Sequence, residues 1–248
     1  MKLSTQKGAD ISGRDFLRSG AAVATVTLAP GVTLMAFGGS QAHAAADSGK
    51  RWGLLIDANK CDADCSACVT ACSDENGWKG HGNPETDAQW IRKITLKNKA
   101  TGRETSMPVM CQHCEAPPCV DVCPTGASFK REDGIVLVDK HTCIGCRYCM
   151  MACPFKARSF VHEPTVNQKS HAPRGQGTVE SCTLCVHRVD KGGTPACVEA
   201  CSAAGHEAII FGDLKDPDSD ISKRLAEYPS VALRPDLDLN PGVRYSNL

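Results

Sequence analysis

The sequence predicts an α+β fold of short β-hairpins and short helices, held together by cysteines and ending in an extended C-terminal arm. All 16 cysteines of the 248-residue chain lie between Cys61 and Cys201, and the chain has only three Trp, three Tyr and six Phe. So few aromatics make a conventional apolar core difficult to build. Covalent or coordinate bonds must therefore help to hold the chain together.

The charge balance excludes one class of partner. The chain has 28 basic and 28 acidic residues and a pI near 7.0. Nothing in this balance attracts nucleic acid or another polyanion, so no nucleic-acid partner is expected. The length allows one domain of ordinary size or two small ones.

Residues 1–44 have the composition of an export signal. Basic residues come first, an interrupted apolar run follows, and Ala42-His43-Ala44 offers the small-x-small pattern at which signal peptidase cuts. Residues 12–18 read S-G-R-D-F-L-R and resemble the twin-arginine motif S-R-R-x-F-L-K, with Gly13 in place of the first arginine. We therefore expect a Tat-type signal peptide over residues 1–44 and a periplasmic protein; the alternative is an amphipathic anchor that is not cleaved. No later segment has 18 apolar residues in succession, so membrane association is expected only through a partner.

The cysteines form four groups of four with none left over. The third group reads C-x2-C-x2-C-x3-C-P, the run typical of bacterial ferredoxins, in which the fourth cysteine serves a second cluster. The second group has C-x2-C-x4-C-x3-C-P, the first C-x3-C-x2-C-x3-C and the fourth C-x2-C-x11-C-x3-C. In chain order the groups are Cys61, Cys65, Cys68 and Cys72; Cys111, Cys114, Cys119 and Cys123; Cys143, Cys146, Cys149 and Cys153; and Cys182, Cys185, Cys197 and Cys201.

The spacing within a group has a geometric reason. Three cysteines two residues apart form a tight loop around three iron corners of one cubane, and the fourth, one helical turn later, points to a second cubane. Pro124 and Pro154 end that turn in the second and third groups. The sequence therefore predicts that all 16 cysteines ligate four [4Fe-4S] clusters, in two bacterial-ferredoxin-like units.

Three other uses of cysteine explain the pattern less well. Exported chains with an even number of cysteines often carry disulfides, but disulfides across two-residue loops are strained. Zinc sites use paired C-x2-C but need neither the third close cysteine nor the proline. Reactive thiols need one exposed cysteine beside a base. A Tat-type signal agrees with iron–sulfur clusters, because cluster assembly needs cytoplasmic machinery and the protein must fold before export.

The remaining elements follow from local patterns. Short helices are expected after the last cysteine of each group, loops over residues 73–83 and 166–177, and a surface helix within residues 216–228. The last 20 residues, with few apolar anchors, are expected to form an arm that binds a partner. The predicted domains are residues 45–215, which carry the clusters, and residues 216–248. Alternating apolar and polar residues predict strands over residues 51–57, 90–96, 135–139 and 209–212.

The chain offers no catalytic site. Every cysteine is used as a ligand, and there is neither a Gly-rich dinucleotide fingerprint nor an acid/base constellation. Arg147, Lys156 and Arg158 are expected on a solvated face, His113 in a loop, and the tryptophans buried beside clusters.

With these motifs the chain resembles the four-cluster iron–sulfur subunits that accompany membrane quinone modules and molybdenum reductases. The resemblance covers nearly all of residues 50–248. It is carried by R-W-G-L-L-I-D at residues 51–57, by the cysteine-containing run over residues 108–160, and by the tail from residue 233 to the end. Within the family these stretches are most similar to subunits of sulfite-reduction-associated, Dsr-type complexes. Subunits of polysulfide, thiosulfate and nitrite reductases and of periplasmic hydrogenases share most of the motifs.

The resemblance implies an electron-transfer subunit without a substrate of its own. Four clusters in series would connect an NrfD-type integral membrane subunit to a periplasmic multihaem cytochrome. The resemblance also implies that the first group of cysteines pairs with the fourth and the second with the third; the extra residue before Cys65 departs from the usual spacing. The implied ligand sets are Cys61, Cys65, Cys68 and Cys201; Cys72, Cys182, Cys185 and Cys197; Cys111, Cys114, Cys119 and Cys153; and Cys123, Cys143, Cys146 and Cys149.

Overall fold

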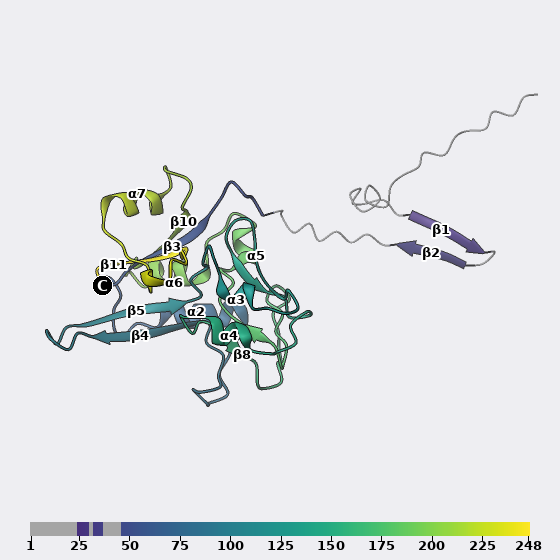
Figure 1. Ribbon diagram of the computed structural model, residues 1–248, viewed down its shortest axis with the longest axis horizontal. Coiled ribbons are helices and arrows are strands. Elements are labelled where there is room, and N and C mark those ends of the chain that lie inside the picture. The colour runs from purple at the N-terminus through teal and green to yellow at the C-terminus, as the bar shows by residue number, and fades with distance from the viewer. Residues whose placement is uncertain (1–23, 30–31, 37–45) are drawn as a thin grey trace, which may run out of the picture. The chain divides into compact units, whose positions relative to one another are not determined.

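The computed structural model describes residues 24–29, 32–36 and 46–248 (Figure 1). The chain divides into two units, residues 1–45 and residues 46–248. In the first unit, β1 (Ala24–Ala29) and β2 (Val32–Ala36) form an antiparallel hairpin. The twin-arginine-like motif and the Ala-His-Ala pattern lie outside the described residues, so the signal peptide stays a prediction. Among the described residues, no helix is long and apolar enough to cross a membrane.

The second unit is built on a three-stranded sheet in the order β10–β3–β11 (Figure 1). The central strand is β3 (Trp52–Asp57); β10 (Ile209–Asp213) pairs with it in antiparallel and β11 (Val243–Ser246) in parallel orientation. The strands predicted from sequence at β3 and β10 are confirmed to within one residue at each end. Leu54 and Ile56 of β3 are buried and form part of the apolar core.

The strand β11 corrects the prediction of a C-terminal arm with few apolar anchors. Val243 and Tyr245 are 1% and 0% exposed, so the end of the chain belongs to the core. The Tyr245 hydroxyl accepts a hydrogen bond from Gln112 Nε2 (3.2 Å) and donates one to the Pro108 carbonyl oxygen (3.3 Å). The prolines and glycines before β11 favoured an arm. The local sequence cannot show that β11 pairs with β3, because β3 lies at the opposite end of the domain sequence.

The helix α7 (Asp220–Glu227) confirms the surface helix predicted within residues 216–228. Ser219 caps its N-terminus, because the Ser219 hydroxyl accepts a hydrogen bond from the Ser222 N–H (3.3 Å). Ile221 is fully buried and faces β10. At Gly212 of β10 a Cβ atom would lie 2.8 Å from Ile221 Cγ2, so the glycine allows α7 to approach the sheet.

Three antiparallel hairpins complete the strands of the second unit. The strands predicted over residues 90–96 and 135–139 are confirmed as members of two of them. The hairpins pair β4 (Ile91–Lys97) with β5 (Glu104–Met110), β6 (Ser128–Lys130) with β7 (Val136–Val138), and β8 (Ser159–Phe160) with β9 (Val179–Glu180).

Four helices each begin one residue before the third cysteine of a group. The prediction that helices follow the last cysteine of each group is therefore wrong, because the helices themselves carry cysteines. In a C-x3-C spacing, residues i and i+4 lie one above the other on one helical face, so a helix suits this part of the motif. The helices are α2 (Ala67–Asn76), α3 (Pro118–Asp121), α4 (Tyr148–Ala152) and α6 (Ala196–Ala203), while α5 (Val186–Val189) directly follows Cys185.

The helices pack in pairs that match the expected pairing of the cysteine groups. α2 packs against α6, and α3 against α4. Both pairs lie within the compact unit of residues 46–248, and the division into two ferredoxin-like units stays a prediction. α2 also shortens the predicted loop over residues 73–83, since the helix ends only at Asn76, with Gly77 as its C-cap. The φ of +70° at Gly77 is a left-handed conformation that glycine adopts without strain.

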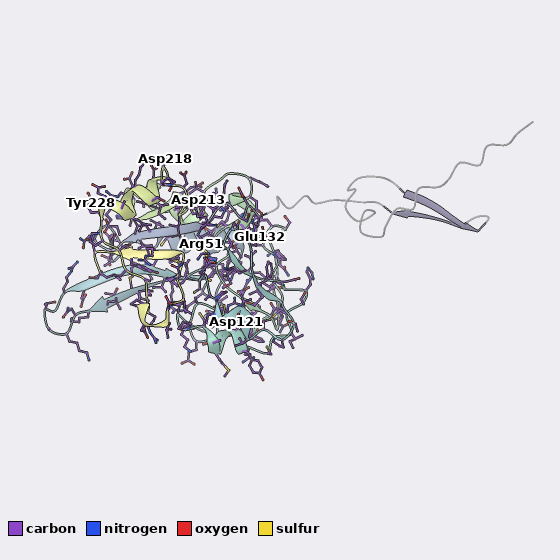
Figure 2. The ribbon with its side chains drawn as sticks, turned by 45° about the horizontal axis from the view of Figure 1, so that its top comes forward. Arg51, Asp121, Glu132, Asp213, Asp218 and Tyr228 are labelled. Carbon is purple, nitrogen blue, oxygen red and sulfur yellow. The ribbon has the colours of Figure 1, made fainter. Side chains whose placement is uncertain are left out.

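Arg51 ties the sheet to the second group of cysteines from inside the domain (Figure 2). Its guanidinium donates hydrogen bonds to the carbonyl oxygens of His113 (2.8 Å) and Gly134 (3.1 Å). Arg51 Nε also pairs with Glu115 Oε2 at 3.2 Å. A buried carbonyl without a donor costs about 1–3 kcal/mol, so these bonds hold the start of β3 against the segment that carries the second group.

Candidate iron–sulfur centres

All sixteen cysteines lie in the described part of the chain and carry free thiols. Most are buried; Cys61, Cys65, Cys123 and Cys143 are half-buried, and Cys146 is exposed. No disulfide joins any two of these described cysteines, which leaves no disulfide framework. The thiols are therefore free to act as ligands.

Three of the four expected ligand sets each surround a cavity. Each cavity is lined by one complete set of four thiols and otherwise mainly by apolar atoms. Site 1 is lined by Cys61, Cys65, Cys68 and Cys201, site 3 by Cys111, Cys114, Cys119 and Cys153, and site 4 by Cys123, Cys143, Cys146 and Cys149.

Site 2 consists of the other four cysteines, Cys72, Cys182, Cys185 and Cys197, all of which are buried. Burial raises the pKa of Cys72 to about 12. Burial also raises the pKa values of Cys182 and Cys197 well above the ordinary thiol value, and the neighbouring thiols of site 2 raise both further. The four side chains are thus close enough to influence one another's charge, and the structure brings together every expected ligand set.

These thiol pKa values show why the sites fit a metal cofactor. Burial raises the pKa of Cys68 to about 11 and the pKa values of Cys111 and Cys114 to about 12, and neighbouring cysteines contribute in each case. Four bare thiolates would repel one another and be poorly solvated there. A bound metal removes this penalty, since a coordinating thiol is deprotonated outright. Four thiolates around one apolar cavity are the donor set of a [4Fe-4S] cluster.

Backbone N–H groups point at sulfur atoms in three of the sites. Such hydrogen bonds stabilise the thiolate and help to set the reduction potential of a cluster. The donors are Ala208 to Cys201 Sγ in site 1 (3.3 Å), Leu184 to Cys182 Sγ in site 2 (3.4 Å), and Ser128 to Cys123 Sγ (3.3 Å) and Val179 to Cys143 Sγ (3.4 Å) in site 4.

Two side chains after the first group add donors at site 2. Trp78 Nε1 lies 3.4 Å from Cys72 Sγ, and Asn76 Nδ2 lies 3.7 Å from the same sulfur atom. Trp78 is buried, as expected for a tryptophan beside a cluster. Asn76 was not expected at the site; its only signal in the sequence is its position four residues after Cys72, one helical turn further along α2.

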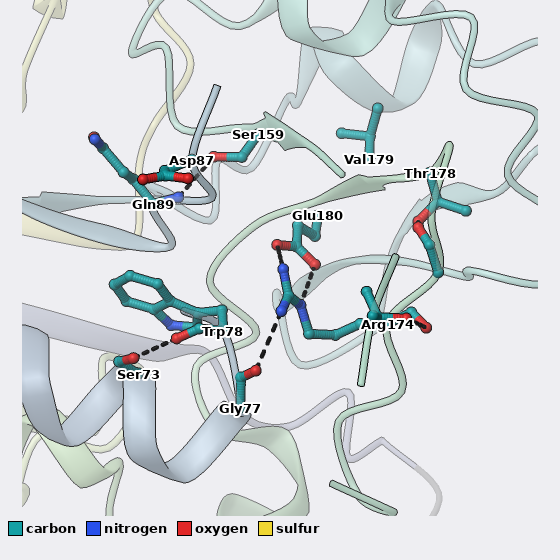
Figure 3. Close-up of polar contacts among 12 residues, drawn as sticks. Ser73, Gly77, Trp78, Asp87, Gln89, Ser159, Arg174, Thr178, Val179 and Glu180 are labelled. Carbon is teal, nitrogen blue, oxygen red and sulfur yellow. Dashed lines mark hydrogen bonds and ion pairs between the residues drawn. The ribbon is translucent and has the colours of Figure 1, made fainter. Parts of the chain in front are cut away.

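A buried ion pair fixes the segment around Trp78 (Figure 3). The Arg174 guanidinium bonds both carboxylate oxygens of Glu180, at 2.8 and 2.9 Å, and also donates to the Gly77 carbonyl oxygen at 3.1 Å. The Ser73 hydroxyl bonds the Trp78 carbonyl oxygen. Removing one partner of a buried pair costs about 3–5 kcal/mol, so this pair holds the Trp78 indole firmly beside site 2.

Arg158 is buried between sites 3 and 4, which corrects the prediction of a solvated side chain. The residue is 5% exposed, and Arg158 Nη2 donates to Cys119 Sγ at 3.2 Å. Burial alone would lower the pKa of Arg158, but the thiolates of Cys119, Cys111 and Cys149 outweigh it and raise the pKa. Arg158 therefore places a permanent positive charge beside cysteines of two sites. The sequence shows only that Arg158 follows Cys153 closely, which does not reveal its burial.

His113, which lies between two cysteines of site 3 in the sequence, is buried rather than a plain loop residue. It is 1% exposed, and its Nδ1 atom accepts a hydrogen bond from the Val136 N–H (3.0 Å). Burial, with Arg51 and Arg158 nearby, lowers the pKa of His113 to about 3. The imidazole is therefore neutral at physiological pH and carries its proton on Nε2.

Site 4 reaches the surface among exposed apolar side chains. Ile144, Tyr148 and Met151, which flank Cys146 in the sequence, are 67%, 56% and 73% exposed. We call these four residues the apolar end. Large apolar side chains gathered at the surface of a protein mark an interaction site.

Site 1 reaches the surface among polar groups instead. Cys61 and Cys65 are half-buried, and Asp62 and Asp64 between them are exposed. Lys93 Nζ donates to the Cys65 carbonyl oxygen at 2.6 Å. We call these five residues the polar end.

Four sets of four thiols, each drawn from two cysteine groups, define an iron–sulfur electron-transfer protein. A model of the 4Fe-4S dicluster domain matches residues 104–213. Curated relatives extend the similarity over most of the chain. The chain is 43% identical over 227 residues to "Hdr-like menaquinol oxidoreductase iron-sulfur subunit 1" of Archaeoglobus fulgidus. This match covers 80% of the chain and 84% of the relative.

Two further relatives come from bacteria. The chain is 38% identical over 207 residues to a tetrathionate reductase subunit of Salmonella typhimurium, covering 80% of this chain and 73% of the relative. It is 34% identical over 239 residues to the "Protein NrfC homolog" of Haemophilus influenzae, covering 94% and 93%. The chain belongs to the family of 4Fe-4S dicluster iron–sulfur subunits of oxidoreductase complexes. It is an electron-transfer subunit and not itself an enzyme, and its cofactors are four [4Fe-4S] clusters.

Proposed function

We propose that the chain is a periplasmic subunit like DsrO of the DsrMKJOP complex, relaying electrons between an NrfD-type membrane subunit and a multihaem cytochrome. The observation that carries the relay is the convergence of all sixteen cysteines into four sites with no thiol left over. The sequence around β3, the run over residues 108–160 and the C-terminal tail support the DsrO-like assignment. The name of the Archaeoglobus fulgidus relative supports menaquinol as the ultimate electron donor.

We assign the ligands of each cluster as the four cysteines of its site. The assignment rests on the cavities of sites 1, 3 and 4 and on the mutual electrostatic influence of the cysteines in site 2. When bound, each cluster accepts and donates one electron. The chain itself supplies the thiolates, the N–H donors that hold them in place, and the apolar walls that limit the entry of water.

The C-x3-C pairs explain how one cluster would communicate with the next. α2 contributes Cys68 to site 1 and Cys72 to site 2. α6 likewise contributes Cys197 to site 2 and Cys201 to site 1. Two neighbouring sites thus share a rigid element with a rise of about 6 Å between its two cysteines. This spacing keeps neighbouring clusters close without any movement of the protein.

The two surface ends suggest which partner binds where. The apolar end at Cys146 suits the membrane subunit, because apolar side chains at an interface are shielded from water by an apolar partner. The polar end at Cys61 suits a soluble cytochrome, which associates transiently through a more polar surface. Export by the Tat-type signal would place both partners on the periplasmic side.

A second candidate function is the iron–sulfur subunit of a molybdenum reductase. The tetrathionate reductase relative from Salmonella typhimurium, at 38% identity, favours this alternative. A subunit of a periplasmic hydrogenase would use the same four sites. In each case the chain remains an electron relay, and only the redox partner at one end differs.

Purification of the native complex from membranes distinguishes these functions. Mass spectrometry should identify an NrfD-type protein and a multihaem cytochrome in stoichiometric amounts with the chain. Reduced menaquinone analogue added to this complex should reduce the clusters, as followed by EPR. A molybdopterin subunit in place of the cytochrome would overturn the DsrO-like assignment and support the alternative.

A further inference from the structure

Three side chains outside the cysteine groups converge from three separate segments of the chain. Glu75 lies in the last turn of α2, His171 in the loop between β8 and β9, and His187 in α5. One potential ligand atom from each side chain lies within 4.8 Å of the other two. None of the three is a ligand in the proposed cluster sites.

Both imidazoles face the same carboxylate oxygen. His187 Nε2 lies 2.7 Å and His171 Nε2 lies 3.8 Å from Glu75 Oε1. The two rings stack with their centroids 4.0 Å apart and an angle of 29° between their planes. His171 Nε2 is also 2.8 Å from the Glu75 carbonyl oxygen, which keeps the ring over the end of α2. The backbone and the ring stacking therefore hold both nitrogen atoms close to one point.

The surroundings leave Glu75 available as a ligand. Arg188 is the nearest strong cation, but its Nη2 pairs with Glu199 at 2.8 Å, while its Nε stays 4.0 Å from Glu75 Oε1. The three side chains are partly buried, with exposures of 27% for Glu75, 34% for His171 and 16% for His187. They lie at an open pocket whose lining includes Glu75 and His171, so ions and water can reach them.

We propose that Glu75, His171 and His187 form a binding site for one divalent transition-metal ion, with Zn²⁺ as the best fit. Two imidazole nitrogens and one carboxylate oxygen are a common set of three protein ligands for zinc, and a water molecule takes the fourth position. The ion replaces the hydrogen bonds that the Nε2 atoms of His187 and His171 make to Glu75, and each imidazole then carries its proton on Nδ1. The fourth position faces the open pocket, where a water molecule can bind.

The site would clamp a long loop onto the elements that carry site 2. Glu75 follows Cys72 in α2 by three residues, and His187 follows Cys185 by two. His171 belongs to the loop predicted and observed over residues 166–177. A metal ion would thus join this loop to both segments, independently of which redox partners the chain serves.

Zinc uptake by the purified holoprotein tests the proposal. The protein, with its full complement of about sixteen irons, is incubated with ZnCl2, freed of unbound ions, and analysed for zinc and iron by mass spectrometry. The wild type should retain one zinc per chain, whereas His171→Ala should lower the affinity at least tenfold. His141→Ala is the matched control, because His141 is exposed and far in sequence from all three proposed ligands, so this variant should retain zinc fully.

A second measurement separates a built site from accidental binding. Zinc X-ray absorption of the loaded protein should show two imidazole nitrogens and one carboxylate oxygen at about 2.0–2.2 Å. Glu75→Gln should also weaken retention while iron content stays constant, so that loss of folding is excluded as the cause. Equal zinc retention by wild type and His171→Ala, no retention by either, or zinc uptake matched by loss of iron would each overturn the proposal.

Discussion

Site 1 and site 4 both open toward solvent, but the residues around their openings have opposite character. At the polar end, two aspartates and a lysine surround half-buried cysteines. At the apolar end, the exposed Ile144, Tyr148 and Met151 flank the exposed Cys146 in the sequence, with the exposed Arg147 between them. The ligand chemistry is the same at both sites. The cysteine motif therefore determines the cofactor, whereas the residues between the cysteines determine what can bind over it.

The inner environments of the two helix pairs also differ. Backbone N–H groups donate to sulfur atoms in sites 1, 2 and 4, and site 2 also receives the neutral side-chain donors of Trp78 and Asn76. Sites 3 and 4 share the buried cation of Arg158. A positive charge stabilises the reduced, more negative form of a cluster, so Arg158 should raise the potentials of sites 3 and 4.

The largest expected effect is the difference between replacing a buried cysteine and replacing an exposed one. Cys197→Ser removes a buried proposed ligand of site 2 and should leave three thiols in a site that no longer holds its cluster. We expect at least about a tenfold loss of soluble protein, because metal binding and folding are coupled. Cys146→Ser at the apolar end should yield folded protein that has lost at most about four irons. Soluble yield and iron per chain measure both effects; equal losses would show that the buried site 2 and the exposed apolar end do not differ in structural importance.

Removal of the Arg158 charge should change the reduction potentials of the sites at one helix pair and not those at the other. Arg158→Gln takes away a charge-assisted hydrogen bond to Cys119. We expect Arg158 to stabilise the reduced form of a cluster by about 1.4 kcal/mol more than the oxidised form. For a one-electron step this free-energy difference corresponds to about 60 mV, so the reduction potentials of sites 3 and 4 should fall by about 60 mV in the variant. Sites 1 and 2 should keep their potentials. EPR-monitored redox titration resolves the clusters.

The control for Arg158 is Lys156→Gln. Lys156 is exposed and lies two residues away in the same segment, so its charge is screened by solvent. An equal shift in both variants would indicate a general charge effect and would remove the assigned role of Arg158.

A charged residue at the apolar end should weaken the proposed membrane partner selectively. Met151 is 73% exposed, so Met151→Glu should change the stability of the isolated chain by no more than about 0.5 kcal/mol. Affinity for the membrane subunit should fall about tenfold, equivalent to about 1.4 kcal/mol. Asp64→Asn at the polar end is the matched variant and should leave this affinity unchanged. Binding to membranes that contain the partner is the measurement, and equal effects of both variants would contradict the assignment of the ends.

Features with local determinants could be predicted from the sequence. The spacing of each cysteine group predicts that three of its thiols serve one cubane and the fourth a second, whereas the pairing of the groups was implied only by the family resemblance; the strands at β3 and β10 follow from local alternation. Features made where distant segments meet could not. Arg158 and Lys156 look alike in the sequence, but only Arg158 is covered when sites 3 and 4 come together. The convergence of His171 with Glu75 and His187 equally depends on how the loop folds back over α2.

The smallest expected effect tests whether the two helix pairs unfold together. Tyr245 in β11 belongs to the sheet beside site 1, yet its hydroxyl bonds Gln112, which lies next to Cys111 of site 3. Tyr245→Phe removes this hydroxyl and should lower stability by about 1 kcal/mol, which is about 3 °C in the midpoint of thermal unfolding for a domain of this size. Tyr228→Phe is the control, because the Tyr228 side chain is exposed. Removal of its hydroxyl should shift the midpoint of thermal unfolding by less than about 1 °C.

The decisive readout is a comparison of two signals at one scan rate. Cluster absorbance reports the iron sites, and circular dichroism reports the backbone. Because β11 and Arg51 connect the sheet to the second cysteine group, both signals should fall in a single transition in the wild type and in Tyr245→Phe. If the variant instead loses absorbance in two steps, with circular dichroism falling mainly in one of them, the helix pairs are separate folding units. The difference between the polar and apolar ends would then extend from their surfaces to their stability.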